Sequence, residues 1–173
     1  MRKLVLLVVC LLMTIGAYAQ SIVGQWVQTD RDAGDGMEML LTETFTVLDG
    51  GAFEEEVIME VRMTDAKSGK SAAVKESIKT FRLKITCKGG WSLVDGTLTQ
   101  TFDAKSIRTE VLEQPDGFPK FIVNMLGKTV SSEFKKQAKK PERYKLVSVT
   151  SDELVLQSTD PDDPGNTTFT RKK

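Results

Sequence analysis

Histidine is absent from this chain of 173 residues, and cysteine occurs only twice. Without imidazole the chain has no histidine base, no Ser-His or Cys-His nucleophile pair, and no copy of the commonest zinc ligand. These absences exclude most hydrolase and metalloenzyme mechanisms, and no other catalytic spacing stands out. We therefore predict a protein that is not an enzyme and that uses no metal and no cofactor, with catalysis through Glu, Asp, Tyr and Lys alone as a third-ranked alternative.

Long apolar runs are also missing, apart from one at the start of the chain. Arg2 and Lys3 provide a positive start, residues 4–13 an apolar core, and Ala17-Tyr18-Ala19 a small-x-small cleavage site. This is the pattern of a secretory signal peptide over residues 1–19, and the apolar run is too short to span a bilayer. The sequence predicts export to the periplasm or the extracellular space, without stable membrane insertion.

Disulfides are excluded as well. Cys10 lies in the signal peptide, so Cys87 is the one cysteine of the mature chain and has no intramolecular partner. The fold must therefore be stabilised by packing. Because Cys87 shares the parity of Phe81 and Ile85, we predict that it is buried and that packing is its only role.

An excess of one charge is missing too, since 24 Lys and Arg balance 24 Asp and Glu. Nucleic-acid binders show a basic stripe with interleaved aromatic residues, whereas the one basic cluster here, over residues 135–143, fits a solvated surface. We predict no nucleic-acid partner, and the protein partner, if any, stays unknown. The mature residues 20–173 have the length of one domain.

What the chain does contain is a series of strand patterns. Residues 53–63 alternate apolar residues with charged ones, although Glu55 falls on the apolar parity, and residues 80–88 alternate without a break. Such a period of two indicates sheets with one face in water. Turn signals at 49–51, 89–90 and 95–96 separate the runs and predict hairpins.

One segment has a helical period instead. Ile122, Leu126, Val130 and Phe134 recur every fourth residue, which predicts a helix near residues 119–140. Its start at Pro119 and its end before Pro141 suit proline, and Gly127 is a point at which the helix could divide.

Counting gives eight to nine short strands joined by local turns, and such a series removes its exposed edges by closing on itself. We predict an all-β protein: an eight-stranded antiparallel up-and-down barrel with one helical insertion before the last strands. A two-sheet sandwich is the alternative.

Several short motifs follow one another along the chain: Gly24-x-Trp26 after a secretory signal, Gly90-Trp91, Asp95-Gly96-x-Leu98, Thr150-x-Asp152-Glu153-Leu154 and the closing Phe169-x-Arg171. In this order they resemble the bacterial lipocalin-like domain proteins. The resemblance implies a calycin-type barrel whose closed end is sealed by Trp26 and Arg171 next to Gly24. It also implies an open end that admits a small apolar molecule.

Six large apolar residues lie on predicted inward parities and are the candidate ligand-binding residues: Phe45, Met59, Met63, Phe81, Trp91 and Phe102. Methionine suits a pocket for irregular apolar ligands, but the same residues could fill a solid core. In the acidic run of residues 54–56, only Glu54 and Glu56 lie on the same face, and they are interpreted as a solvated face in preference to a carboxylate dyad. The expected function is an exported, non-enzymatic lipocalin-like protein that binds a small hydrophobic ligand. The alternative is a solid-core interaction module that uses the basic end of the helix or residues 66–75.

Overall fold

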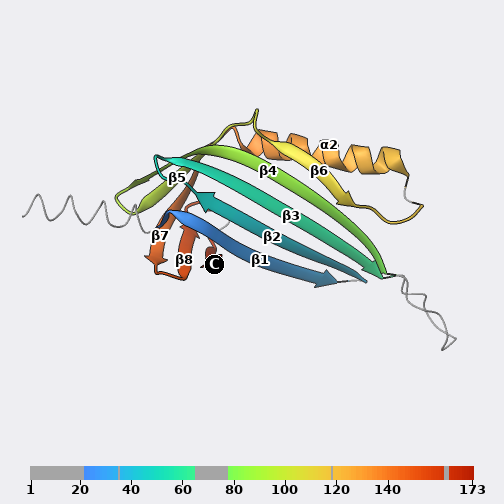
Figure 1. The fold of residues 1–173 in the computed structure, drawn as a ribbon, viewed down its shortest axis with the longest axis horizontal. Coiled ribbons are helices and arrows are strands. Elements are labelled where there is room, and N and C mark those ends of the chain that lie inside the picture. Colours follow the sequence, from blue (N-terminus) through green and yellow to red (C-terminus); the bar gives the residue numbers. More distant parts are fainter. Residues whose placement is uncertain (1–21, 35, 65–77, 118, 162–163) are drawn as a thin grey trace, which may run out of the picture.

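The computed structural model describes residues 22–34, 36–64, 78–117, 119–161 and 164–173; the predicted signal peptide and the candidate loop at 66–75 lie outside these ranges. The described residues form nine strands and the helix α2 (Figure 1). In chain order these are β1 Gly24–Gly34, β2 Met37–Val47, β3 Ala52–Thr64, β4 Ile78–Val94, β5 Thr97–Phe102, β6 Arg108–Glu113, α2 Lys120–Gln137, β7 Glu142–Val149, β8 Glu153–Ser158 and β9 Asn166–Arg171.

Eight of these strands close into an antiparallel barrel in the order β1-β2-β3-β4-β5-β7-β8-β9. Closure is made by β1 and β9, where Trp26 pairs with Arg171 and Val27 with Thr170. The predicted barrel with a helix before the last strands is therefore confirmed, and the two-sheet sandwich is wrong. Closure satisfies the edges that an open sheet would leave unpaired.

The ninth strand, β6, continues along β4 where β5 leaves it. Residues Gly89–Val94 of β4 pair with β5, whereas Arg82–Thr86 pair with β6. The first four strands have 11 to 17 residues, and the strands after α2 have 6 to 8. Strands β1 to β4 therefore extend beyond the short strands β7 to β9. The helix α2 lies beside β6, next to the extended part of β4 (Figure 1).

One predicted turn is wrong. The Gly89-Gly90 pair lies inside β4, which runs without a break from Ile78 to Val94. A Cβ on Gly89 would come within 2.6 Å of the Phe53 ring and 2.3 Å of the Thr101 carbonyl oxygen. The glycine serves a close approach between neighbouring strands. The turn at Asp95-Gly96 is confirmed, with both residues at positive φ, as a two-residue hairpin requires.

The helix α2 runs through Gly127 without dividing, and Pro119 precedes its first residue. Its inward side presents Val123, Val130 and Phe134 to the barrel. Leu126 was expected on that side but is 38% exposed. The interval from 123 to 130 is seven residues, close to two helical turns, so the buried stripe follows a 3–4 spacing in place of a strict four.

The interior contains two apolar clusters. The first lies at the end that Trp26 closes, and the second lies under α2. The closed-end cluster consists of Ile22, Trp26, Phe45, Val47, Phe53, Leu98, Leu154, Leu156 and Phe169. The helix-end cluster consists of Val57, Phe81, Leu83, Ile85, Cys87, Ile107 and Val123.

Candidate functional site

The predicted closure residues meet at the closed end. The guanidinium carbon of Arg171 lies 4.1 Å from the centre of the Trp26 ring, and Arg171 Nη1 donates to the Val23 carbonyl at 3.0 Å. Trp26 is fully buried, and its indole N–H donates to the Ile22 carbonyl. A Cβ at Gly24 would lie 2.4 Å from Arg171 Nη1, so glycine at this position leaves room for the guanidinium. All three residues have a structural role here.

The six predicted ligand-binding residues are spread over the interior. Phe45 belongs to the closed-end cluster, Trp91 packs against that cluster, and Phe81 and Met59 pack in or against the helix-end cluster. Met63 is partly buried near the far end of β3, opposite Met37. Of the six, Phe102 alone is among the described residues that line the interior cavity.

That cavity lies between the two clusters and has a volume of about 220 Å³. Its walls come from five barrel strands, the loop before β6 and the end of α2. The lining residues are Leu41, Glu43, Glu55, Val57, Cys87, Gln100, Phe102, Ile107, Phe134, Gln137, Ala138, Glu142 and Tyr144. Three carboxyl groups thus face a space that contains no lysine or arginine among its described walls.

Strand pairing places the polar lining residues at the same height in the barrel. Glu55 lies opposite Cys87 of β4 and Phe45 of β2, and Glu142 lies opposite Gln100. We call Glu43, Glu55, Gln100, Glu142 and Tyr144 the polar belt, because these side chains line one cavity from four strands. Strand parity makes each of them point inward.

The electrostatics of the belt follow from burial without a counter-ion. Burial, followed by the charges of Glu43 and Glu142, raises the pKa of Glu55 to about 8. Burial also raises the pKa of Glu43, against a hydrogen bond that Gln28 donates to its carboxylate. Desolvation disfavours a charged carboxylate, so the raised pKa favours the protonated form of Glu55 at neutral pH.

Two further titratable groups face the same space. Burial raises the pKa of the Cys87 thiol, as do the charges of Glu55, Glu142 and Glu43. The pKa of Tyr144 is raised by burial and then by Glu142, which accepts a hydrogen bond from the Tyr144 hydroxyl at 2.7 Å. The predicted burial of Cys87 is confirmed at 4% exposure. Cys87 also lies opposite Glu55 in the β3–β4 pair, and both residues line the cavity, so Cys87 has a carboxyl neighbour as well as apolar ones.

Gln100 is the most buried member of the belt, with 5% of its surface exposed. It lies on the inward parity of β5 between Leu98 and Phe102 and lines the cavity. Its side-chain amide makes no hydrogen bond with any residue that the structure describes. The amide is not among the fully buried side-chain groups without a partner, and because Gln100 lines the cavity, a ligand or water there can satisfy it.

The sequence carried a signal for this site that our interpretation missed. Glu54 and Glu56 are on the solvated face as expected, with Lys88 and Lys84 beside them. Glu55 was expected on the apolar parity of its strand, but no polar site was predicted from it. Because neighbouring strand residues point to opposite faces, Glu55 points inward. A carboxyl on an inward parity was the signal for a polar cavity.

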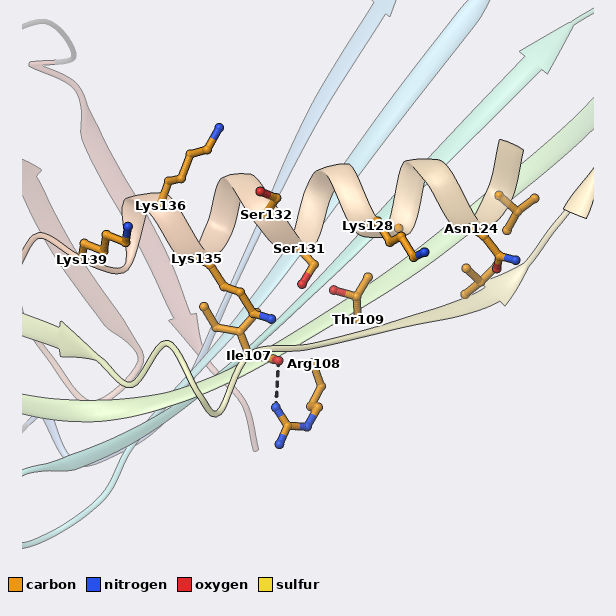
Figure 2. Close-up of a pocket in the computed structure, with 13 residues that line it drawn as sticks. Ile107, Arg108, Thr109, Asn124, Lys128, Ser131, Ser132, Lys135, Lys136 and Lys139 are labelled. Atoms are coloured by element: carbon orange, nitrogen blue, oxygen red, sulfur yellow. Dashed lines mark hydrogen bonds between the residues drawn. The ribbon is translucent and has the colours of Figure 1, made fainter. Parts of the chain in front are cut away.

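A second concave feature lies outside the barrel, between α2 and β6. This groove encloses about 900 Å³ and is lined by Ile107, Arg108, Thr109, Val111, Val123, Asn124, Gly127, Lys128, Ser131, Ser132, Lys135, Lys136 and Lys139. Figure 2 shows Ser131 and Lys135 on the side of the helix that faces β6, where Thr109 points back toward the helix. Five of the lining residues are cationic and none is acidic.

No protein-family model matches the chain, and no curated protein sequence matches it. Among the described residues no group of three or more carboxylates and thiols could hold a metal ion. Within those same ranges, no helix has both the length and the apolar character needed to cross a membrane.

Proposed function

We propose that this protein is a non-enzymatic, lipocalin-like binding protein that holds one small molecule inside its barrel. The observation that carries this proposal is the cavity of about 220 Å³ beneath α2. A cavity of about 150 Å³ lined by apolar groups is large enough for benzene, so this one has room for a somewhat larger molecule. Barrels of eight strands are of the size that holds one small ligand.

The walls favour a molecule with an apolar part. Leu41, Val57, Phe102 and Phe134 provide apolar surface from β2, β3, β5 and α2. These walls favour the hydrophobic ligand expected from the sequence, although of the six residues predicted to bind it only Phe102 is among the described lining residues. Ligand sites combine such apolar walls with a few fixed polar groups, and the polar belt provides these here.

The non-enzymatic part of the proposal is supported by the two potential nucleophiles. The pKa values of Cys87 and Tyr144 are both raised by burial and by neighbouring carboxylates. A nucleophilic thiol or phenol needs the opposite shift, because the anion is the reactive form. Both groups are therefore suited to hydrogen bonding.

We also propose that the protein works outside the cytoplasm, in the periplasm or the extracellular space. The charged start, the apolar core and the small-x-small site of residues 1–19 support this. If export occurs, the mass of the protein recovered from that compartment will correspond to a chain that begins at Gln20. A full-length chain recovered from the cytoplasm alone would contradict it.

Ligand binding can be tested with a panel of neutral, cationic and anionic aromatic molecules of about benzene to indole size, followed by ligand-observed NMR. We expect saturable binding of at least one member at one site per chain. Ala138→Phe fills the cavity from the end of α2, and Val57→Phe fills it from β3, so both should abolish binding. Val147→Phe is the matched control, because Val147 is 50% exposed on β7.

Circular dichroism and melting curves must show that the variants are folded. If no panel member binds the wild-type protein, and native mass spectrometry finds no co-purified molecule, the barrel interior is not a ligand site.

A second candidate function is an interaction module that binds an acidic protein segment in the groove between α2 and β6. The observation that favours it is the lining of five cations without an acidic residue. Complementary charge speeds encounter and selects partners. Lys128→Glu with Lys135→Glu should abolish capture of an acidic peptide, whereas Lys145→Glu on β7, outside the groove, should leave it unchanged. Equal binding by both variants would contradict this function.

A further inference from the structure

All the charged side chains that line the cavity, among the described residues, are acidic. Glu43, Glu55 and Glu142 approach it from β2, β3 and β7, and its described walls contain no cationic side chain. Fixed charges taken out of water are normally paired. Glu43 and Glu142 accept hydrogen bonds from Gln28 and Tyr144, but these donors are neutral.

Gln100 gives an independent indication of a ligand. This side chain is more than nine-tenths buried, lines the same cavity and has no hydrogen-bond partner among the described residues. An amide oxygen accepts hydrogen bonds from N–H groups. A donor in the cavity would therefore satisfy Gln100 and the carboxylates together.

We infer that the ligand carries a positively charged amino group that binds at Glu55, Glu142 and Gln100, while its apolar part lies against Phe102 and Phe134. This inference rests on the proposed function and names the chemical class of its ligand. The class is a small primary amine attached to an aromatic or aliphatic body. A bound ammonium supplies three N–H donors and the missing counter-charge.

The inference predicts a measurable effect, which is the release of a proton when the ligand binds. The groups that face Glu55 are Glu43 from β2, Cys87 from β4 and Glu142 and Tyr144 from β7, and the residues of α2 at the cavity carry no charge. When no cation is bound, a pKa of about 8 favours the protonated Glu55 carboxyl at pH 7. A bound ammonium favours the carboxylate, so each binding event releases a proton from Glu55 to solvent.

The test compares three molecules of similar shape: phenethylamine, 2-phenylethanol and 3-phenylpropanoate. Titration calorimetry with the full mature protein at pH 7 should show the amine binding about tenfold or more tightly than the alcohol, with no binding of the carboxylate. The enthalpy for the amine should depend on the buffer, which reports proton release. Its affinity should rise between pH 6 and pH 8 as Glu55 loses its proton in the free protein.

The variant Glu55→Gln should weaken amine binding about tenfold or more, remove the buffer dependence and leave binding of the alcohol within about twofold. Glu54→Gln is the matched control, because its side chain is on the outer face beside Lys88, and it should change neither value. Glu142→Gln tests the opposite wall and keeps the experiment decisive if Glu55→Gln does not fold.

Alcohol binding as tight as amine binding, or amine affinity unchanged in both Gln variants, would overturn the inference and leave the proposed binding function standing. Binding of 3-phenylpropanoate in preference to the amine would do the same. Absence of binding by all three molecules and by the wider panel would overturn both proposals.

Discussion

The two ends of the barrel interior are built from the same strands but in different ways. At the closed end Phe45 meets Phe53 with ring centres 5.5 Å apart, and Phe53 meets Phe102 edge to face at 5.2 Å. At the helix end, α2 covers aliphatic side chains above a belt of carboxyl and amide groups. One end is filled by aromatic rings, and the other leaves a cavity.

Under the proposed function, the closed end stabilises the fold and the helix end holds the ligand. Aromatic residues bury large areas and fix one another's positions, so the closed end needs no ligand to be complete. Polar groups at the other end lose water without gaining full partners, which costs stability. A barrel can carry this cost at one level when the rest of its interior is densely packed.

The largest expected effect is at the closed end. Trp26→Ala removes a fully buried indole and should lower the free energy of unfolding by about 3 to 5 kcal/mol. Phe134→Ala at the cavity should cost less than about 2 kcal/mol, because Phe134 is only partly buried and already borders empty space. Urea unfolding of both variants measures the difference, and equal losses would show that the two ends are packed alike.

The next largest loss of stability is expected at Gly89, where β4 packs closely against its neighbouring strands. Gly89→Ala places a methyl group against the Phe53 ring and the Thr101 carbonyl oxygen, and overpacking of this kind costs about 1 to 3 kcal/mol. Gly90→Ala is the control, since the nearest atom to its Cβ would be the Gly51 carbonyl oxygen at 3.5 Å, an ordinary contact. A Gly89→Ala protein as stable as Gly90→Ala would mean that β3 and β4 are farther apart.

The Arg171 contact over Trp26 should be worth somewhat less. Arg171→Ala loses the cation–π contact and the hydrogen bond to the Val23 carbonyl, and we expect a loss of about 1 to 3 kcal/mol. Lys173→Ala removes an exposed charge two residues away, whose ion pair with Asp152 spans 3.9 Å, and should change stability by less than about 0.5 kcal/mol. Thermal melting of both distinguishes them; a Lys173 effect as large as that of Arg171 would argue against the closure role.

The last prediction concerns the pH dependence of stability that the polar belt causes. The folded-state pKa of Glu55 is raised from 4.5 to about 8, so between these values the folded protein holds a proton that the unfolded chain has released. Stability therefore falls as pH rises from 5 to 8, by at most about 1.4 kcal/mol per pH unit for one group, and levels off above 8.

Glu55→Gln should flatten this slope in urea unfolding across that pH range, whereas Glu54→Gln should retain it. A wild-type stability that rises between pH 5 and 8 would show that Glu55 is solvated and charged.

Local sequence patterns were enough to predict much of this fold. The alternation in residues 80–88 gave the inward face of β4, including Cys87, and the helix near residues 119–140 was placed to within a few residues. The positions of Trp26 in the first strand and Arg171 in the last were enough to predict their contact, because the first and last strands of a barrel must pair. The prediction of a turn at Gly89-Gly90 was wrong, because glycine occurs where two strands approach closely as well as where the chain reverses.

The sequence by itself thus determined which residues point inward, since parity within a strand is a local property. Only the tertiary structure decided which inward residues share a level. Glu43, Glu55, Gln100 and Glu142 come from strands separated by a hairpin, an inserted strand and a helix, and their meeting depends on the register of the whole closed sheet. Register is set by turns and by packing across the barrel. The cavity therefore depends on how the barrel closes, whereas the inward or outward direction of each side chain depends on its position within its own strand.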